Sequence, residues 1–177
     1  MTCSLFTLAT FTSGKPPLHL VPFSLRPIIQ DLVDELTLLA DDRRIPLSFE
    51  SQSVPPVLGD AQWLTQALIN LLDNALHYTP SGGAVTVRLQ AAREEVTVVV
   101  EDTRHGIEPE HLPHFFERFY RTDRARAKDS GGTGLGLAII KEIVEAYGGT
   151  VLVTSQVDKG SAFTLRFPVL SHQAVLA

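Results

Sequence analysis

The chain has 177 residues, a formal net charge of −5 and a hydrophobic content of 44%. Such a length fits one domain with a sizeable buried core, and the acidic balance gives no support for a nucleic-acid partner. The single cysteine, Cys3, excludes an internal disulfide framework, and no apolar run is long enough to span a membrane.

The N-terminal part of the chain predicts a short edge strand and an amphipathic helix. Residues 18–22 read as the strand because prolines flank it on both sides. Ser24 then caps a helix over about 25–41. The apolar residues expected to face the core from this helix are Leu25, Ile28, Ile29, Leu32, Leu36 and Leu39.

A second helix follows two short strand candidates at 46–51 and 54–58. Asp60 caps this helix, which covers about 61–78. Its apolar residues repeat at the i, i+3, i+4, i+7 spacing of one buried face. They are Leu64, Ala67, Leu68, Leu71, Leu72 and Ala75.

The second half of the chain alternates strands and helices in mixed order. Strands are expected at 84–89, 96–100, 150–155 and 162–167, with a short helix near 109–117 and a longer one at 135–147. Hairpin-like pairs recur among the strands. We therefore predict an α+β fold in which one mixed sheet carries helices on one face.

Two asparagines stand four residues apart on the second helix, so Asn70 and Asn74 share one face beside the apolar stripe. Asp73 falls on the solvent side. An amide oxygen is a neutral, hard ligand suited to Mg²⁺, which usually arrives with phosphates. The alternative is that both amides only bond nearby backbone.

A glycine-rich segment, residues 131–137, leads directly into the helix at 135–147. Glycines let backbone N–H groups approach an anion, and a helix N-terminus adds partial positive charge. It is not a Walker motif, since no lysine followed by Ser or Thr completes the pattern. A flexible connector is the alternative interpretation.

Arginines and a lysine crowd the segment just upstream of these glycines. Arg121 adjoins the aromatic pair Phe119 and Tyr120, which we expect to anchor it over a polyphosphate. For Arg124, Arg126 and Lys128 a solvated loop is the favoured interpretation.

Asp102 ends a fully apolar strand. A carboxylate at that place can accept a hydrogen bond from an exocyclic amine such as that of adenine. Taken alone, Asp102 would be better explained as an ordinary turn aspartate.

The order of these features resembles the ATP-binding catalytic domain of bacterial sensor histidine kinases. This domain belongs to the superfamily shared with gyrase, the Hsp90 chaperones and mismatch-repair ATPases. The resemblance rests on the asparagine helix, Asp102 with a following glycine, FERFYR at 116–121, GGTGLGLAI at 131–139 and a final Gly-Ser-x-Phe at 160–163. It covers about residues 15–168.

The resemblance implies a two-layer α/β sandwich of Bergerat type that holds ATP and Mg²⁺ between the asparagine helix and a mobile lid. At the phosphate end it implies that Asn74 is the Mg²⁺ ligand and Asn70 its supporting neighbour, with His77 and Tyr78 towards the phosphates and ribose. It also implies that Arg121 meets the phosphates and that a cradle and lid hinge is formed by Gly132, Thr133, Gly134, Leu135, Gly136 and Leu137.

At the base end the resemblance implies that Asp102 reads the adenine amino group. Gly106 and Ile107 would line the base, and Ser161 would lie near it through water.

Asn70 also bears on the reaction. Hydrolysing relatives, and serine kinases of anti-sigma type, carry glutamate at the matching position, and an amide cannot act as a general base at neutral pH. We therefore expect Asn70, Asn74 and Arg121 to present the γ-phosphate to a nucleophile. The resemblance implies that this nucleophile is a histidine on a helical dimerisation domain, with a response regulator further downstream.

Three positions depart from the family pattern. Arg104 replaces a glycine beside the adenine site, which predicts weakened ATP affinity, with added strain if the backbone there needs a positive φ. His77 replaces the usual lysine or arginine and makes that charge pH-dependent. Asp158 stands where another glycine is common.

None of the six histidines has the neighbours of a phosphoacceptor. We therefore read residues 1–14 as the remnant of a preceding dimerisation helix, 15–170 as the catalytic domain and 171–177 as a flexible tail. The domain is expected to be monomeric and cytoplasmic, with any membrane anchor in a segment outside this chain. The alternative is a degenerate nucleotide- or protein-binding module without kinase activity.

Overall fold

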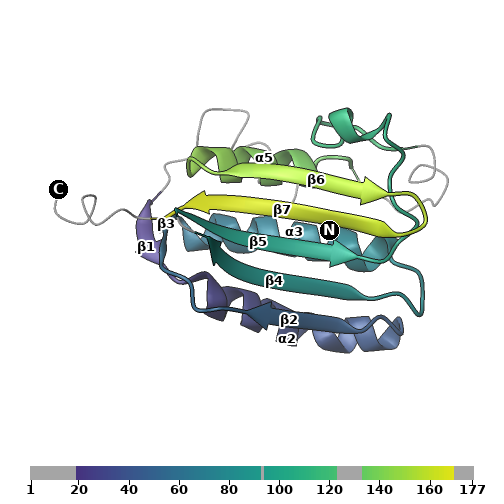
Figure 1. Cartoon of the computed structure of the whole chain (residues 1–177), viewed down its shortest axis with the longest axis horizontal. Coiled ribbons are helices and arrows are strands. Elements are labelled where there is room, and N and C mark those ends of the chain that lie inside the picture. Colours follow the sequence, from purple (N-terminus) through teal and green to yellow (C-terminus); the bar gives the residue numbers. More distant parts are fainter. Residues whose placement is uncertain (1–18, 93, 123–132, 170–177) are drawn as a thin grey trace.

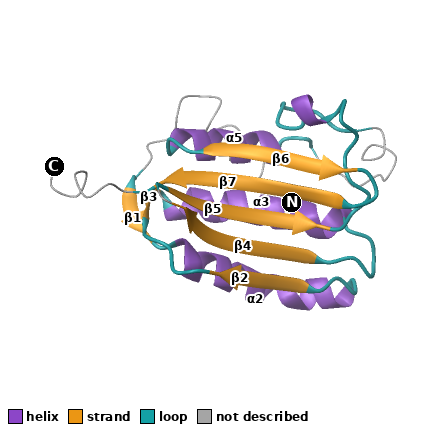
Figure 2. Ribbon diagram, in the orientation of Figure 1, coloured by secondary structure: helices purple, strands orange, loops and turns teal. Residues whose placement is uncertain are grey.

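The computed structural model describes residues 19–92, 94–122 and 133–169. Within these ranges the chain forms a five-stranded sheet in the order β2-β4-β5-β7-β6, covered on one face by three helices (Figures 1 and 2). The main elements are α2 (Leu25–Asp42), β2 (Leu47–Ser51), α3 (Ala61–Tyr78), β4 (Val85–Ala92), β5 (Glu95–Asp102), α5 (Gly136–Ala146), β6 (Thr150–Gln156) and β7 (Gly160–Pro168). The predicted α+β class, with helices on one face of a mixed sheet, is confirmed.

Strand alternation decides what the helices cover. Val96, Val98 and Val100 on β5 are fully buried, while the residues between them are only half-buried. Successive side chains point to opposite faces of a sheet, so the buried valines face the helices. Asp102 has the same parity as these valines, and it is therefore carried to the helix-covered face, where it is 1% exposed.

The same parity governs the two neighbouring strands. Ser161 on β7 is two residues from the buried Phe163, and Ser155 on β6 is two residues from Val153. The strand register pairs Asp102 with Ser161 and Ser161 with Ser155. Three polar side chains thus end the buried apolar rows of three adjacent strands, side by side at one end of the sheet.

Helix α3 lies at the centre of the helical layer, between α2 and α5. Asp60 caps it as predicted, since the carboxylate accepts a hydrogen bond from the Gln62 N–H at 3.0 Å. The hydroxyl of Tyr147, just beyond α5, donates to the Asp60 carbonyl at 3.0 Å. This bond joins the start of α3 to the end of α5.

Two expectations about the helices were wrong. Leu39 of α2 is 37% exposed and Ala40 is buried instead, because the buried face advances by four residues from Leu36. The helix expected near 109–117 is only the single 3-10 turn η1 (Leu112–His114), since Pro113 inside it has no N–H to continue a helix.

The N-terminal strand was predicted slightly too early. Strand β1 (Val21–Phe23) pairs antiparallel with β3 (Val57–Gly59) in a separate two-stranded sheet. Residues 1–14 and 171–177, for which a helix remnant and a tail were expected, lie outside the described residues.

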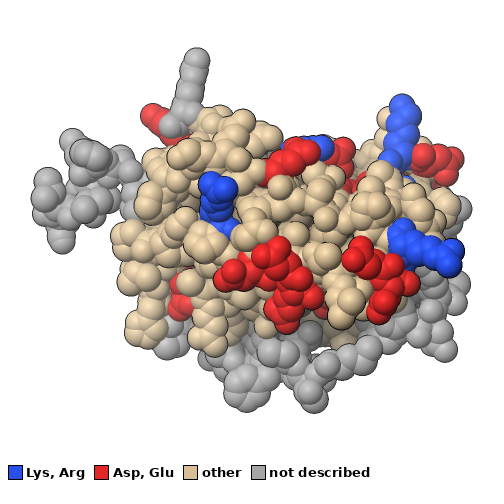
Figure 3. All heavy atoms as spheres, turned by 90° about the horizontal axis from the view of Figure 1, so that it is seen from below, with Lys and Arg blue, Asp and Glu red and all other residues tan. Residues whose placement is uncertain are grey.

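Acidic side chains outnumber basic ones on the side of α2 and β2 (Figure 3). The exposed acids of α2 are Asp31, Asp34, Glu35, Asp41 and Asp42. The described part of this side is therefore predominantly acidic, which disfavours it as a docking face for a polyanion.

Along the described residues, no helix combines the length and the apolar character needed to cross a bilayer.

Gly160→Ala should destabilise the domain strongly. Its φ is +129°, and an added Cβ would lie 1.9 Å from the Asp102 carbonyl oxygen. The matched control is Gly82→Ala, whose φ is +85° but whose Cβ would meet nothing within 4 Å. Left-handed backbone alone costs about 1–2 kcal/mol, so urea unfolding should show that loss for the control and a clearly larger one for Gly160→Ala. Equal losses would mean that the strand ends relax around an added methyl group.

Candidate functional site

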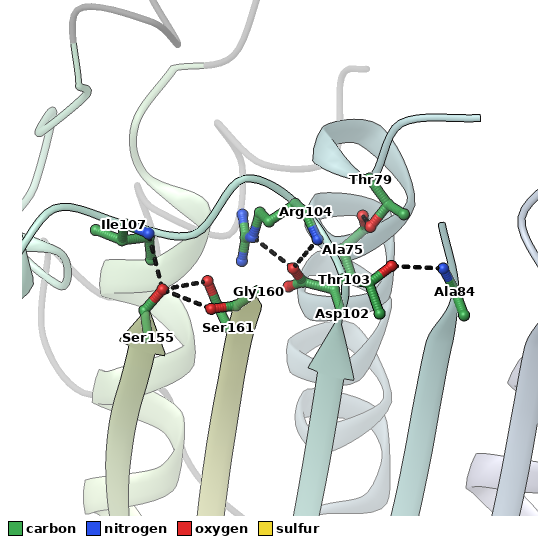
Figure 4. A network of polar contacts seen from close by, with 10 residues as sticks. All are labelled: Ala75, Thr79, Ala84, Asp102, Thr103, Arg104, Ile107, Ser155, Gly160 and Ser161. Atoms are coloured by element: carbon green, nitrogen blue, oxygen red, sulfur yellow. Dashed lines mark hydrogen bonds and ion pairs between the residues drawn. The ribbon is translucent and has the colours of Figure 1, made fainter. Parts of the chain in front are cut away.

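Two of the three polar residues at the sheet end, Ser155 and Ser161, belong to one hydrogen-bonded group (Figure 4). The Ser155 hydroxyl donates to the Gly160 carbonyl at 2.8 Å and accepts from the Ile107 N–H at 2.7 Å. Its oxygen is also 2.8 Å from the Ser161 hydroxyl oxygen. Because the single proton of Ser155 is used by Gly160, Ser161 must donate to Ser155.

The loop after β5 is fastened to the turn between β6 and β7. Gly106 has a φ of +76°, and a Cβ there would lie 2.2 Å from the Gln156 carbonyl oxygen. The Asp158 N–H donates to the His105 carbonyl at 2.7 Å, with Asp158 itself at a φ of 62°. Ile107, at the end of this loop, is buried. Ile107 is therefore bonded to Ser155 at the end of β6, and Gly106 lies against Gln156 next to it.

Arg104 is the least expected feature of the site. Its side chain points back from the loop towards Asp102 (Figure 4), and the residue is only 6% exposed. The guanidinium Nε lies 2.9 Å from Asp102 Oδ1, and the Arg104 backbone N–H donates to the same oxygen at 3.1 Å. Its φ is not positive, so the backbone strain considered from the sequence is absent.

Two aromatic rings enclose the Arg104 guanidinium. Its central carbon is 5.8 Å from the centre of the Tyr78 ring of α3 and 5.2 Å from that of Phe163 on β7. Both distances suit a cation over an aromatic face. Arg104 thus lies between α3 and the sheet, at the level of the Asp102 carboxylate.

Burial dominates the electrostatics of this pair. It raises the pKa of the Asp102 carboxyl above the ordinary value, and the charge of Arg104 opposes the rise. It lowers the pKa of Arg104, and Asp102 opposes that change in turn. Asp102 Oδ2 and Arg104 Nη2 are both buried without a hydrogen-bond partner among the described residues. Arg104 Nε is also without a hydrogen bond of good geometry, so the side chains are held together by their charges.

The two asparagines of α3 lie where the sequence predicted, at the half-buried edge of the core, while Asp73 is exposed. Asn70 Oδ1 accepts a hydrogen bond from Gln66 Nε2 at 3.3 Å. The Asn74 amide nitrogen is buried and has no partner among the described residues. A Cβ on Gly136 would lie 3.9 Å from the Asn70 Cβ, so the asparagine face looks onto the N-terminus of α5.

The side chains of His77 and Tyr78 point into different surroundings at the end of α3, although their rings pack edge to face with centroids 4.8 Å apart. Tyr78 faces Arg104. His77 lines a cavity of about 410 Å³ between the ends of α2 and α3, together with Arg43 and Thr79. The two residues therefore serve different surroundings.

The lid segment is described only as far as residue 122 and again from 133. Tyr120 is held by its hydroxyl, which lies 2.8 Å from His111 Nδ1. Phe119 is 67% exposed with a φ of 65°, so its side chain is not the anchor expected from the sequence. Its N–H instead donates to the Gly134 carbonyl at 2.9 Å. This bond joins the backbone at residue 119 to the backbone at residue 134.

The remaining predicted site residues are only partly described. Arg121 is half-buried at the end of the lid segment, Thr133 is exposed, Leu135 is buried and Leu137 is half-buried. Gly132, Arg124, Arg126 and Lys128 lie outside the described residues.

The site suits a metal-bound polyphosphate at one end. Two amides share a helix face opposite a helix N-terminus, and the Asn74 amide nitrogen is a buried donor without a partner among the described residues. Amide oxygens are ligands that Mg²⁺ accepts, and a helix N-terminus attracts phosphate. At the other end, Asp102 Oδ2 is an unused buried acceptor that fits an exocyclic amine, although Arg104 lies against the same carboxylate.

Ser155 was missed by sequence reasoning. The signal was available, because Val151, Val153 and Ser155 alternate with exposed residues along one strand. A serine that continues a buried apolar row must find hydrogen bonds there.

Comparison with known proteins identifies relatives of the whole arrangement. The family described as histidine kinase-, DNA gyrase B- and HSP90-like ATPases matches residues 59–171. The sensor histidine kinase CusS of Escherichia coli O157:H7 is 48% identical over 130 residues, which are 73% of this chain and 27% of that protein. The sensor-like histidine kinase SenX3 of Mycobacterium tuberculosis is 34% identical over 170 residues, 96% of this chain and 42% of that protein.

Solved structures agree with these matches. Full-length ShkA in complex with AMPPNP has a TM-score of 0.82 and 28% identity, covering 93% of this chain and 34% of that one. The nucleotide-free catalytic domain of the histidine kinase ThkA has a TM-score of 0.74 and 26% identity. The match covers 85% of this chain and 95% of that one. The chain spans less than half the length of the two curated relatives.

Ser155→Ala should loosen the pocket wall. It removes a half-buried hydroxyl that serves Gly160, Ser161 and the Ile107 N–H, and orphaned buried groups cost about 1–3 kcal/mol. Ser48→Ala is the matched control, because its hydroxyl bonds only the exposed Thr86 hydroxyl at 3.1 Å and should change stability by less than about 0.5 kcal/mol. Denaturant unfolding of both variants measures the difference. A Ser155→Ala loss no larger than that of the control would show that the wall holds without this hydroxyl.

Proposed function

The chain belongs to the family of histidine kinase-, DNA gyrase B- and HSP90-like ATPases, and from this premise we propose that it is the ATP-binding catalytic domain of a two-component sensor histidine kinase. It transfers the γ-phosphate of ATP to a histidine on a dimerisation domain that is not part of this chain. The phosphoryl group then passes to a response regulator. Such a domain works in the cytoplasm, where ATP and Mg²⁺ are available.

The observation that carries this proposal is the asparagine face of α3 opposite the N-terminus of α5. Asn70 and Asn74 supply neutral oxygens there, and Gly136 leaves the helix end open towards them. Sequence identity to named sensor histidine kinases supports the assignment. The relative ShkA has been crystallised with an ATP analogue, which supports adenine nucleotide as the ligand.

The chemistry of the amides favours transfer over hydrolysis. Neither Asn70 nor Asn74 can take a proton from water at neutral pH. Phosphoryl transfer needs positioning and charge neutralisation more than acid–base chemistry. Asn74 would hold Mg²⁺ with Asn70 beside it, and the bound ion would neutralise charge on the phosphates. Arg121 would contribute a further positive charge from the lid.

The other assigned residues complete the pocket in this proposal. Tyr78 borders it at the end of α3, and Asp102 receives the adenine amino group. His77, which was expected towards the phosphates, instead lines the cavity beside Arg43 and Thr79. The base is lined by Gly106, Ile107 and Ser161. The phosphate cradle and hinge are formed by Gly132, Thr133, Gly134, Leu135, Gly136 and Leu137.

A second candidate is a degenerate module that binds nucleotide or protein and transfers nothing. The observation that favours it is Arg104 lying on Asp102, the carboxylate assigned to the base. Intact asparagines on α3 favour the kinase. Measured transfer of phosphate separates the two.

Asn74→Ala should remove the part of ATP affinity that depends on Mg²⁺. Calorimetric titration of the chain with ATP should show a loss of at least about tenfold in the presence of Mg²⁺, equal to about 1.4 kcal/mol, and little change in its absence. Asp73→Ala, on the exposed side of the same helix, should match the unaltered chain. Equal affinity of Asn74→Ala and the unaltered chain in Mg²⁺ would remove this residue from the metal site.

The chain supplied with γ-labelled ATP should label a separately produced dimerisation domain. The domain of E. coli CusS is the reasonable acceptor, because that kinase is 48% identical over the matched region. The label should be acid-labile, as expected of phosphohistidine, and Asn74→Ala should abolish it. ATP binding without transfer would favour the binding module. Steady release of inorganic phosphate by the chain alone would favour a hydrolysing switch.

A further inference from the structure

We propose that Arg104 is a built-in competitor of the nucleotide base: its guanidinium occupies the place on Asp102 that the base must take, so ATP binds only when this side chain has moved aside. The inference rests on the proposed function and concerns the affinity of the same site. It assigns the role of setting nucleotide affinity to a residue outside the asparagine helix and the glycine hinge.

The surroundings of the guanidinium are those that a purine amine would require. The group is planar and carries N–H donors. It lies against a buried carboxylate, with Nε 2.9 Å from Asp102 Oδ1. The ring centres of Tyr78 and Phe163 lie 5.8 and 5.2 Å from the central carbon of the guanidinium. A flat nitrogen base that donates an amine hydrogen to Asp102 would seek the same carboxylate and the same aromatic walls.

The backbone shows that this position is not imposed by strain. The φ of Arg104 is in the ordinary range, and its N–H is bonded to Asp102 independently of the side chain. The loop is fastened on its far side through His105 and Ile107. The guanidinium can therefore swing out of the cleft while the loop backbone and its hydrogen bonds remain.

The free-energy difference between the closed state, with Arg104 on Asp102, and the open state, with Arg104 in solvent, is small enough for a ligand to reverse. Opening hydrates the Arg104 guanidinium and so recovers its desolvation cost, while the Asp102 carboxylate, 1% exposed, stays buried and receives the amine of the base as its new donor. In the closed state Nη2 and Oδ2 have no hydrogen-bond partner among the described residues, which limits the stability of that state. If the open state is populated at about 1–10%, apparent affinity falls by the same fraction, about ten- to a hundredfold.

The test compares the 177-residue chain with Arg104→Ala in calorimetric titrations with MgATP. Arg104→Ala should bind at least about tenfold more tightly, since it need not open first. Arg26→Ala is the control for loss of one positive charge, because Arg26 is exposed in the first turn of α2, and it should bind like the unaltered chain. Equal or weaker binding by Arg104→Ala overturns the proposal, and weaker binding would mean that Arg104 holds the base.

Magnesium tripolyphosphate, which has no base, distinguishes competition from a general charge effect. Removing Arg104 should not tighten its binding. An increase as large as that for MgATP would also overturn the proposal. If neither ligand binds to any of the variants, the proposed function itself fails, which is a separate result from equal ATP binding by all of them.

A measurement on the unaltered chain guards against misfolding of the variant. With ¹⁵N-labelled arginine, the Arg104 Nε–H should exchange slowly with water in the free protein, because it is buried against Asp102. Saturating MgATP should make that exchange fast as the side chain enters solvent. An Arg104 signal that stays protected in the complex contradicts displacement.

Discussion

A carboxylate buried at the end of a strand is the constraint on which the site depends. The alternation of side chains along β5 directs Asp102 to the helix-covered face of the sheet, because Asp102 continues the buried row of Val96, Val98 and Val100. Desolvation then penalises its charge, so the molecule must supply a cation or a donor, or the ligand must. Arg104, Ser161 and the loop around Gly106 are arranged around that requirement, and the register of three strands brings them together.

Periodicity was enough to predict most of the architecture. The apolar repeat of α3 and the alternation in β4 and β5 follow directly from burial on one face, and both helix boundaries of α3 agreed with the structure. The failures have local causes. Pro113 prevents the helix that was expected near 109–117. The buried face of α2 continues from Leu36 to Ala40, so Leu39 is exposed.

The site was only partly visible in the sequence. Spacing predicted which way Asn70, Asn74 and Asp102 point, whereas their assignment to a nucleotide site rested on the family resemblance. Spacing alone gives no contact between distant segments, so the bonding of Ser155 to Ile107 could not be predicted. The same limit applies to Arg104, whose presence beside the pocket followed from its neighbours in sequence. Its inward rotamer depends on rings from α3 and β7, which no local pattern brings together.

The row formed by Asp102, Ser161 and Ser155 joins two hairpins that are far apart along the chain. β4 and β5 form one, β6 and β7 the other, and each can close over a short loop. The row exists only once β5 and β7 have paired, and closing so long a loop has a larger entropic cost. No fragment that contains a single hairpin therefore holds a pocket. Assembly of this end of the sheet is thus inseparable from the pairing of β5 with β7.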